Sequence, residues 1–236
     1  MPVNLHELSR AVKSEARRLG FQLVGITTPD LPAHFEIYQR WLQAGRHAQM
    51  GYLAADRALE CRQDPLKILP ECRSILMLGI QHDAPDSSGG KQHTRSSSIE
   101  NGEDQLQGDV SKDQTLYGRV AAYAWGADYH DILPVRMAAL VRFIESTLGY
   151  KVPNRWYTDT GPILERDFAQ QAGLGWIGKN TCLINPRLGS FFLLGTILLG
   201  LALAPDEPFT HDRCGTCTRC VDACPTGCIL PDRTID

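Results

Sequence analysis

CGTCTRCVDACP, residues 214–225, is compatible with fewer kinds of structure than any other stretch of this sequence. Its cysteines stand at the spacing C-x₂-C-x₂-C-x₃-C-P, which lets three thiolates of one tight loop bind adjacent corners of an iron–sulfur cube. A structural zinc ion is the competing interpretation, but zinc usually takes two ligands from one turn and two from a distant one. Disulfides fit less well, because a chain with no secretory start suits a reducing compartment. The stretch therefore predicts a [4Fe–4S] site in a redox protein.

The same motif leaves its ligand set incomplete. In two-cluster ferredoxins the fourth cysteine of such a run binds the other cluster, and a second run supplies the missing ligands. The remaining cysteines, Cys61, Cys72, Cys182 and Cys228, form no second run. Either one of them completes a single cube or the natural protein continues past Asp236. We expect a truncated chain that holds its iron poorly, because neither cube has a full ligand set.

Length and composition are those of a globular protein with one sizeable core and a small appended module. The 236 residues are 43% hydrophobic and 22% charged, which is ordinary for such proteins. The N-terminus lacks the apolar segment of a signal peptide, and the longest apolar run, residues 191–204, is too short to span a bilayer. These features predict a cytoplasmic protein with no membrane partner. The net charge of −3 argues mildly against a nucleic-acid partner, which would need a local basic patch.

Periodicity predicts alternating helices and strands before the cysteine-rich end. Helical spacing of apolar residues predicts helices over residues 5–19, 35–45 and 129–148, and one starting near Pro162. Strand formers predict strands over residues 21–27, 74–80, 118–125, 156–158, 182–184 and 191–203. The fold expected is α+β, with a ferredoxin-like iron–sulfur appendix. From His82 to Thr115 polar residues dominate, so we predict a disordered insert.

Three further features each have an ordinary interpretation. Residues 173–178, GLGWIG, match G-x-G-x-x-G but follow a predicted helix and precede no acidic residue at the required distance, so a dinucleotide site is not predicted. They form either a plain glycine loop or one that approaches a large flat ligand, with Lys179 and Asn180 at its edge. His130, in a first helical turn, is on its own a surface or capping residue. Asp159, at the end of a short strand, is on its own an N-cap for the helix near Pro162.

Several blocks taken together resemble one family. They are GADYH at residues 126–130, DTGP at 159–162, AGLGWIGKN at 172–180 and CGTCTRCVDACPTG at 214–227. In this order they resemble the epoxyqueuosine reductases, over nearly the whole chain outside the polar insert. The resemblance implies a nitroreductase-like core that binds cobalamin and two [4Fe–4S] clusters that deliver electrons from an external donor. The implied substrate is epoxyqueuosine at the wobble position of tRNA, whose epoxide oxygen is removed to leave queuosine.

The resemblance also implies roles for particular residues. Cys214, Cys217 and Cys220 match ligands of one cluster and Cys224 a ligand of the other. Asp159 matches the proton donor, beside a cobalamin attacking the epoxide. The cobalamin-contacting positions implied are Arg62, Tyr129, His130, Asp159, Lys179 and Asn180. The implied domains are a catalytic core over residues 1–205 and a partial ferredoxin-like domain over residues 206–236.

The sequence departs from the family pattern in three places. The second cysteine run and the helical repeats that many members carry after it are absent, and Cys228 stands where a small apolar residue is usual. Two other functions stay open at this stage. A cobalamin-dependent reductive dehalogenase shares the cofactors, although its exported members carry a twin-arginine signal that is not seen here. A plain electron-transfer protein would need only the cysteine loop, and Asp159 would then merely cap a helix.

Overall fold

The computed structural model describes residues 4–82 and 120–236. Its helices and strands, in chain order, are α1 (Leu5–Arg18), β1 (Leu23–Thr27), α2 (Phe35–Gln43), α3 (Asp56–Gln63), β2 (Ser74–Gln81), α4 (Tyr129–Leu148), β3 (Asn154–Tyr157), α5 (Glu165–Gln171), β4 (Trp176–Ile177), β5 (Leu183–Ile184), β6 (Phe192–Leu199) and α6 (Arg219–Asp222). Short 3₁₀ turns occupy Gly51–Leu53, Pro65–Lys67 and Ala122–Ala124. The insert predicted over residues 82–115 lies outside the described residues, except for His82.

The central sheet of the described residues has four strands in the order β1-β2-β6-β3, and every neighbouring pair is antiparallel. Strands β2 and β6 lie in the middle and pair along their full lengths, from Ser74 opposite Leu199 to Gln81 opposite Phe192. An antiparallel sheet with separate helices is an α+β arrangement, as the sequence predicts. A second, two-stranded sheet joins β4 to β5.

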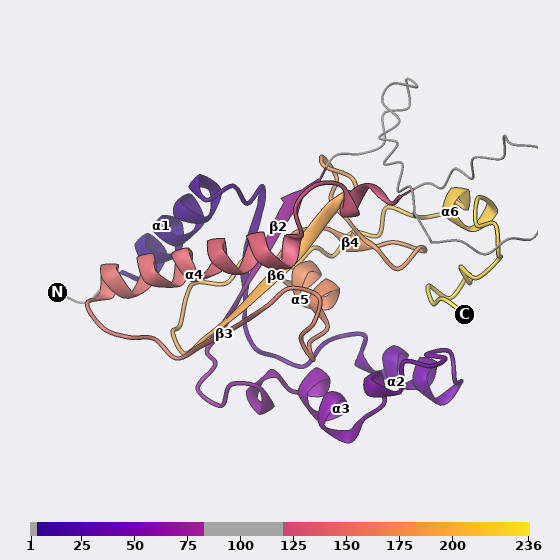
Figure 1. Ribbon diagram of the computed structural model, residues 1–236, viewed down its shortest axis with the longest axis horizontal. Helices are drawn as coiled ribbons and strands as arrows, with labels where there is room; N and C mark the ends of the chain where they lie inside the picture. Colours follow the sequence, from indigo (N-terminus) through magenta and orange to yellow (C-terminus); the bar gives the residue numbers. More distant parts are fainter. Residues whose placement is uncertain (1–3, 83–119) are drawn as a thin grey trace, which may run out of the picture.

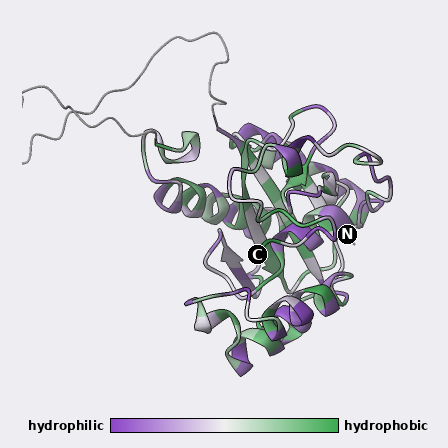
Figure 2. Cartoon of the chain, turned by 90° about the vertical axis from the view of Figure 1, so that its right-hand side faces the viewer, coloured by the Kyte–Doolittle hydropathy of each residue, from purple (hydrophilic) through white to green (hydrophobic). Residues whose placement is uncertain are grey.

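Helices cover both faces of the sheet because its central strands alternate their side chains between two cores (Figure 1). On β2, Leu76 and Leu78 belong to the core formed with α1 and α4. The intervening Ile75 and Met77 belong to the core formed with α5. A period of two along a strand places successive residues on opposite faces. Accordingly, the central strands in Figure 2 are mostly hydrophobic, whereas the helices around them carry both kinds of residue.

Local capping explains where the long helices begin and end. The Asn4 side chain accepts a hydrogen bond from the His6 N–H and caps α1. Asp128 accepts from the His130 N–H at 2.8 Å and caps α4. Helix α4 ends at Leu148 and is capped by Gly149, whose φ of 79° is the left-handed conformation that closes helices without a side-chain clash.

Two sequence-based predictions of local structure are wrong. In the described part of the strand predicted over residues 118–125, Ala122–Ala124 instead forms a 3₁₀ turn. Alanine favours helical conformations over extended ones, and this stretch is largely exposed, so no sheet partner overrides that preference. The helix expected to start near Pro162 begins at Glu165. The intervening residues form bends, because the chain must first leave the left-handed conformation at Asp159.

The C-terminal segment, residues 206–236, lies against the core at several points. The Phe209 ring stacks on Trp176 at 5.9 Å between centroids, and its backbone N–H donates to Gln170 at 2.9 Å. The Trp41 indole N–H donates to the Ile235 carbonyl at 2.7 Å, which brings α2 to the same segment. Within the part of the chain that the structure covers, no helix combines the length and apolar character needed to cross a bilayer.

Candidate active site

Asp159 lies at the end of β3 in a backbone conformation that few non-glycine residues adopt. Its φ is 63°, in the left-handed region. The residues around it hold this turn in place. Tyr157 pairs with Thr196 of β6, and the Thr158 hydroxyl donates to the Leu194 carbonyl at 2.8 Å. A strained residue that its surroundings hold in place is a common feature of functional sites.

The Asp159 carboxylate meets the first turn of α4. The Tyr129 hydroxyl donates a hydrogen bond to Asp159 Oδ2 at 3.1 Å. Burial, followed by the negative charge of Asp159, raises the pKa of Tyr129 to about 12, so this phenol keeps its proton at neutral pH. The His130 ring lies 4.0 Å from the Tyr129 ring, and its Nδ1 is 2.9 Å from Asp128 Oδ1. The structure thus brings three of the predicted site residues, Tyr129, His130 and Asp159, together.

Asp159 does not cap the following helix, which was the ordinary interpretation of its position. The N-cap residue of α5 is Leu164, and its side chain makes no capping hydrogen bond. The Asp159 side chain instead faces Tyr129 across the site.

Glu165, which the sequence analysis did not single out, is a further ionisable group on the element that follows Asp159. It is the first residue of α5 and is partly buried. The Thr196 hydroxyl donates to its Oε1 at 3.2 Å. Burial of the carboxyl group raises the pKa of Glu165 to about 7, and the charge of Asp159 acts in the same direction. The signal available in the sequence was an acidic residue six positions after Asp159, preceded by apolar residues and followed by Arg166, which is too common a pattern to identify it.

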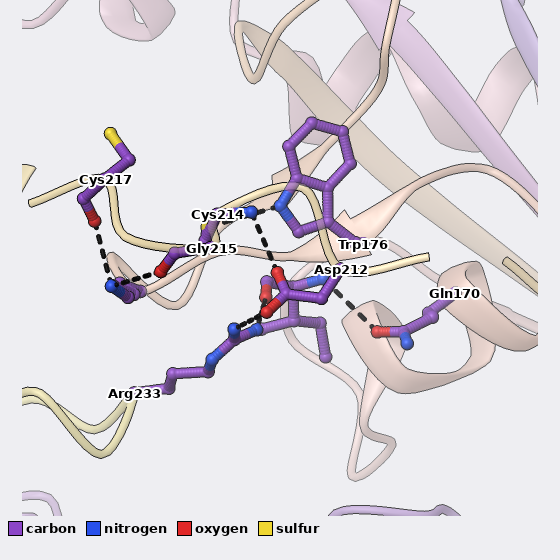
Figure 3. A network of polar contacts seen from close by, with 9 residues as sticks. Gln170, Trp176, Asp212, Cys214, Gly215, Cys217 and Arg233 are labelled. Carbon is purple, nitrogen blue, oxygen red and sulfur yellow. Dashed lines mark hydrogen bonds and ion pairs between the residues drawn. The ribbon is translucent and has the colours of Figure 1, made fainter. Parts of the chain in front are cut away.

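The cysteine loop is fastened to the glycine loop by polar contacts (Figure 3). The Trp176 indole N–H donates to Cys214 Sγ at 3.4 Å. The Lys179 ammonium donates to the carbonyls of Gly215 and Cys217, at 2.9 Å each. Lys179, predicted to contact cobalamin, therefore makes its described contacts with the backbone of the cluster-binding motif.

A second set of contacts supports the cysteine loop through the backbone N–H of Cys214. The Asp212 carboxylate accepts from the Cys214 N–H at 2.9 Å and forms an ion pair with Arg233 (Figure 3). Arg233 also donates to the Ile177 carbonyl at 2.8 Å. The hydrogen bond from Cys214, together with Arg233, holds the pKa of Asp212 below its ordinary value. The Arg233 side chain thus ties the end of the chain, the cysteine loop and β4 together.

The fourth cysteine of the motif lies in a turn rich in hydrogen-bond donors. Cys224 Sγ is 3.5 Å from the Thr226 hydroxyl, which lies 2.8 Å from Cys228 Sγ. The Thr226 hydroxyl and neighbouring backbone N–H groups lower the pKa of Cys224 to about 6. A cysteine that favours its thiolate form has the character of a metal ligand. Cys220, the third cysteine, lies in α6.

In the ranges 4–82 and 120–236, no three side chains of His, Cys, Asp or Glu converge closely enough to bind a single metal ion. An iron–sulfur cube takes one thiolate at each of its corners, so its ligands surround a body instead of meeting at a point. Four cysteines on one short segment, with N–H donors directed at two of them, have the chemistry that such a cube requires.

The glycines of the G-x-G-x-x-G stretch make room for the protein's own backbone. A Cβ on Gly175, whose φ is 159°, would lie 2.1 Å from the Ile184 carbonyl oxygen. A Cβ on Gly173 would lie 2.6 Å from the Glu207 carbonyl oxygen. These contacts support the interpretation as a plain glycine loop, packed between β5 and the C-terminal segment.

Asn180 and Arg62, the two other predicted site residues, occupy different places. The Asn180 side chain accepts from the Cys182 N–H at 3.2 Å, within the loop that Arg166 of α5 contacts through Thr181. Arg62 lies on α3, where it donates to the Ala58 carbonyl and covers the Tyr38 ring. Among the described residues, its polar contacts do not reach the Asp159 site.

Comparisons with known proteins agree on one family. The family described as "Epoxyqueuosine reductase QueG, DUF1730" matches residues 62–160. An epoxyqueuosine reductase of Pseudomonas aeruginosa is 33% identical over all of this chain and 59% of its own length. One from Cyclobacterium marinum is 34% identical over 97% of this chain and 66% of its own length. The solved structure of the Streptococcus thermophilus epoxyqueuosine reductase is 27% identical with a TM-score of 0.76, over 96% of this chain and 54% of that one.

The match thus runs through the whole chain, whereas the chain spans 59% and 66% of the length of these two relatives. Sequence identity of this extent and a shared fold lead to the same assignment, which the ordered blocks in the sequence had also indicated. The chain belongs to the epoxyqueuosine reductase family.

Proposed function

We propose that this chain carries the catalytic core of an enzyme that reduces epoxyqueuosine to queuosine in tRNA, with Asp159 as proton donor. The observation that carries the proposal is the Asp159 site, in which a strained carboxyl residue accepts a hydrogen bond from a phenol whose pKa is raised. Family membership supplies the reaction class. Strain and perturbed ionisation together are typical of active sites.

The proposed core, residues 1–205, is nitroreductase-like and binds cobalamin beside Asp159. Exposed aromatic side chains support this placement, because they suit the edge of a large flat ring. Tyr123 is 52% exposed and contributes to the raised pKa of Tyr129. Trp156 of β3 is 38% exposed. When bound and reduced, cobalamin would supply a cobalt centre nucleophilic enough to attack an epoxide carbon.

Tyr129, His130 and Asn180 would line the proposed cobalamin site. Lys179 and Arg62 are also proposed contacts, and their described partners lie in the cysteine loop and on α2 and α3.

The proposed ferredoxin-like segment, residues 206–236, binds iron–sulfur clusters. Cys214, Cys217 and Cys220 would bind one cube, and Cys224 a second. The indole N–H directed at Cys214 supports this assignment, because hydrogen bonds to cluster sulfurs stabilise the reduced form. An external donor would supply the electrons, and the contacts of Trp176 and Lys179 would hold the segment against the core.

Asp159 would supply the proton that this reaction requires. Removal of an epoxide oxygen as water consumes two electrons and two protons, and the oxygen leaves only after it has been protonated. A carboxylic acid serves as the donor only while it holds its proton. An ordinary aspartic acid is protonated about once in a thousand at pH 7, a deficit of roughly 4 kcal/mol.

Two measurements test the proposal. Cobalamin is added to the purified protein and binding is followed by its absorbance, and the chemically reduced complex is then mixed with epoxyqueuosine-containing tRNA. We expect stoichiometric corrin binding and queuosine in the tRNA after a single turnover, as detected by mass spectrometry. A plain electron carrier would bind no corrin, and a reductase for another substrate would bind corrin and leave the tRNA unchanged. Either result would overturn the proposal.

A further inference from the structure

Cys228 is a fifth cysteine at the end of the cysteine-rich segment and stands outside the C-x₂-C-x₂-C-x₃-C-P motif. Its Sγ lies 2.8 Å from the Thr226 hydroxyl, and the same hydroxyl lies 3.5 Å from Sγ of Cys224. Because both sulfurs contact one oxygen atom, the gap between them cannot exceed these two contacts laid end to end. Cys228 is therefore a close neighbour of the fourth cysteine of the motif.

The backbone turns between these two cysteines. The Gly227 N–H donates to the Cys224 carbonyl at 3.2 Å, which closes a four-residue turn. Gly227 has a φ of 67°, in the left-handed region that glycine adopts without a side-chain clash. The turn reverses the chain, and the next residue, Cys228, comes back towards Cys224.

The position of Cys228 is also fixed from its C-terminal side. Its carbonyl accepts a hydrogen bond from the Asp236 N–H at 3.0 Å, and Ile229 forms an antiparallel bridge with Ile235. The Ile235 carbonyl in turn accepts from the Trp41 indole of α2 at 2.7 Å. The place of this sulfur therefore does not depend on the cysteine loop alone.

A free cysteine has an ordinary explanation, since it often serves as a small apolar residue of a core. That explanation predicts a buried sulfur among apolar side chains. Cys228 is instead partly exposed, as Cys224 is, and its sulfur lies against the hydroxyl of the exposed Thr226. Neither apolar core of the described residues contains it.

We propose that Cys228 is an alternative ligand of the iron–sulfur cube that Cys224 binds, and that its thiolate takes the same corner when Cys224 is absent. A cube takes one thiolate at each corner, so only one of two neighbouring sulfurs binds there at a time. The other sulfur stays beside the cluster, next to the Thr226 hydroxyl. The inference rests on the proposed function only for the presence of this cube and involves neither cobalamin nor tRNA.

The spacing of the two thiols is tested in the cluster-free protein. Dibromobimane, which becomes fluorescent when it joins two nearby thiols, is added to the wild type and to the control Cys182→Ala, which removes an exposed cysteine elsewhere. We expect peptide mass spectrometry to find a bridge between Cys224 and Cys228 in both proteins. Absence of this bridge would overturn the inference.

Iron loading tests whether Cys228 binds the cube. The wild type, Cys224→Ala, Cys228→Ala, the double variant and Cys182→Ala are reconstituted with iron and sulfide without oxygen. Both single variants at the pair, and the Cys182→Ala control, should keep close to the wild-type iron content. The double variant should lose about half of it, because one of the two cubes loses its ligand at this corner. A Cys224→Ala protein with as little iron as the double variant would overturn the inference, and so would a double variant with wild-type iron.

Alkylation of the loaded proteins gives a second readout, which an effect on folding alone would not produce. Iodoacetamide should modify Cys228 in the wild type, where Cys224 holds the corner, and leave Cys228 unmodified in Cys224→Ala, where its thiolate is bound. Equal modification of Cys228 in the two proteins, measured by peptide mass spectrometry, would overturn the inference. Failure of the proposed reaction would instead be seen as absent corrin binding or unchanged tRNA, and it would leave these results standing.

Discussion

The Tyr129 hydroxyl donates to Asp159 Oδ2 at 3.1 Å and so joins the start of α4 to the end of β3. The phenol keeps its proton because its pKa is raised to about 12, and the carboxylate oxygen is therefore the acceptor. This hydrogen bond holds the Asp159 side chain against the first turn of α4.

Asp159→Asn removes the transferable proton while it keeps the shape of the side chain and an oxygen that accepts from Tyr129. We expect single-turnover reduction of epoxyqueuosine to slow by about 10²- to 10⁴-fold, the usual contribution of a general acid. Corrin binding and the melting temperature should stay near the wild-type values. Asp131→Asn, the same change at an exposed position of α4, is the control. Near-normal turnover would move the acid to another group.

Tyr129→Phe removes the hydrogen bond to Asp159 and retains the ring that lies against His130. The Asp159 side chain loses a hydrogen bond worth about 0.5–1.5 kcal/mol, so it is held less firmly and single turnover should slow by up to about tenfold. Single-turnover rates check this, with Tyr150→Phe, an exposed tyrosine after α4, as the control. An unchanged rate would show that the phenol does not position the acid.

Lys179→Met removes the donor to the Gly215 and Cys217 carbonyls and leaves an apolar chain of similar length. A hydrogen bond from a charged group contributes about 1.5–3 kcal/mol, so local opening of the cysteine loop should become at least about tenfold more frequent. Hydrogen exchange of residues 213–218, followed by mass spectrometry, measures the effect without any cofactor. Lys67→Met, at an exposed lysine, should leave exchange unchanged. Equal exchange in both variants would contradict the role given to Lys179.

His34→Ala should weaken the pH dependence of folding near neutrality. His34 Nδ1 lies 2.6 Å from Oδ1 of the buried Asp167, and this hydrogen bond is the main cause that raises the pKa of His34. Stability from a raised histidine pKa is fully present below the unfolded value, near 6.5, and is lost as pH rises through the folded value. Because His34 is partly exposed, we expect this pH-dependent contribution to the free energy of unfolding to be about 1 kcal/mol.

Urea unfolding between pH 5.5 and 8.5 measures this contribution. The wild type should lose stability relative to His34→Ala as pH rises, and His6→Ala, at an exposed histidine of α1, should follow the wild type. Parallel curves for wild type and His34→Ala would contradict the prediction.

Features with a local cause could be predicted from the sequence. The apolar spacing and the capping residues Asn4 and Asp128 place α1 and α4, and the apolar run from Ser74 places β2. Cysteine spacing and the order of the motifs indicated the family and, through it, Asp159 as the candidate proton donor. The predicted start of α5 was wrong because Asp159 takes a left-handed conformation after two residues, Tyr157 and Thr158, that contacts with β6 hold in place.

By itself, the sequence determined the long helices and the central strands, most of the residues that bear the chemistry and the family to which the chain belongs. Only the tertiary structure decided which of those residues meet. The contacts of Tyr129 with Asp159, of Glu165 with Thr196 and of Lys179 with the cysteine loop join positions about thirty or more residues apart. Such contacts depend on the register of β3 against β6 and on helices packed on both sheet faces, which no local periodicity encodes.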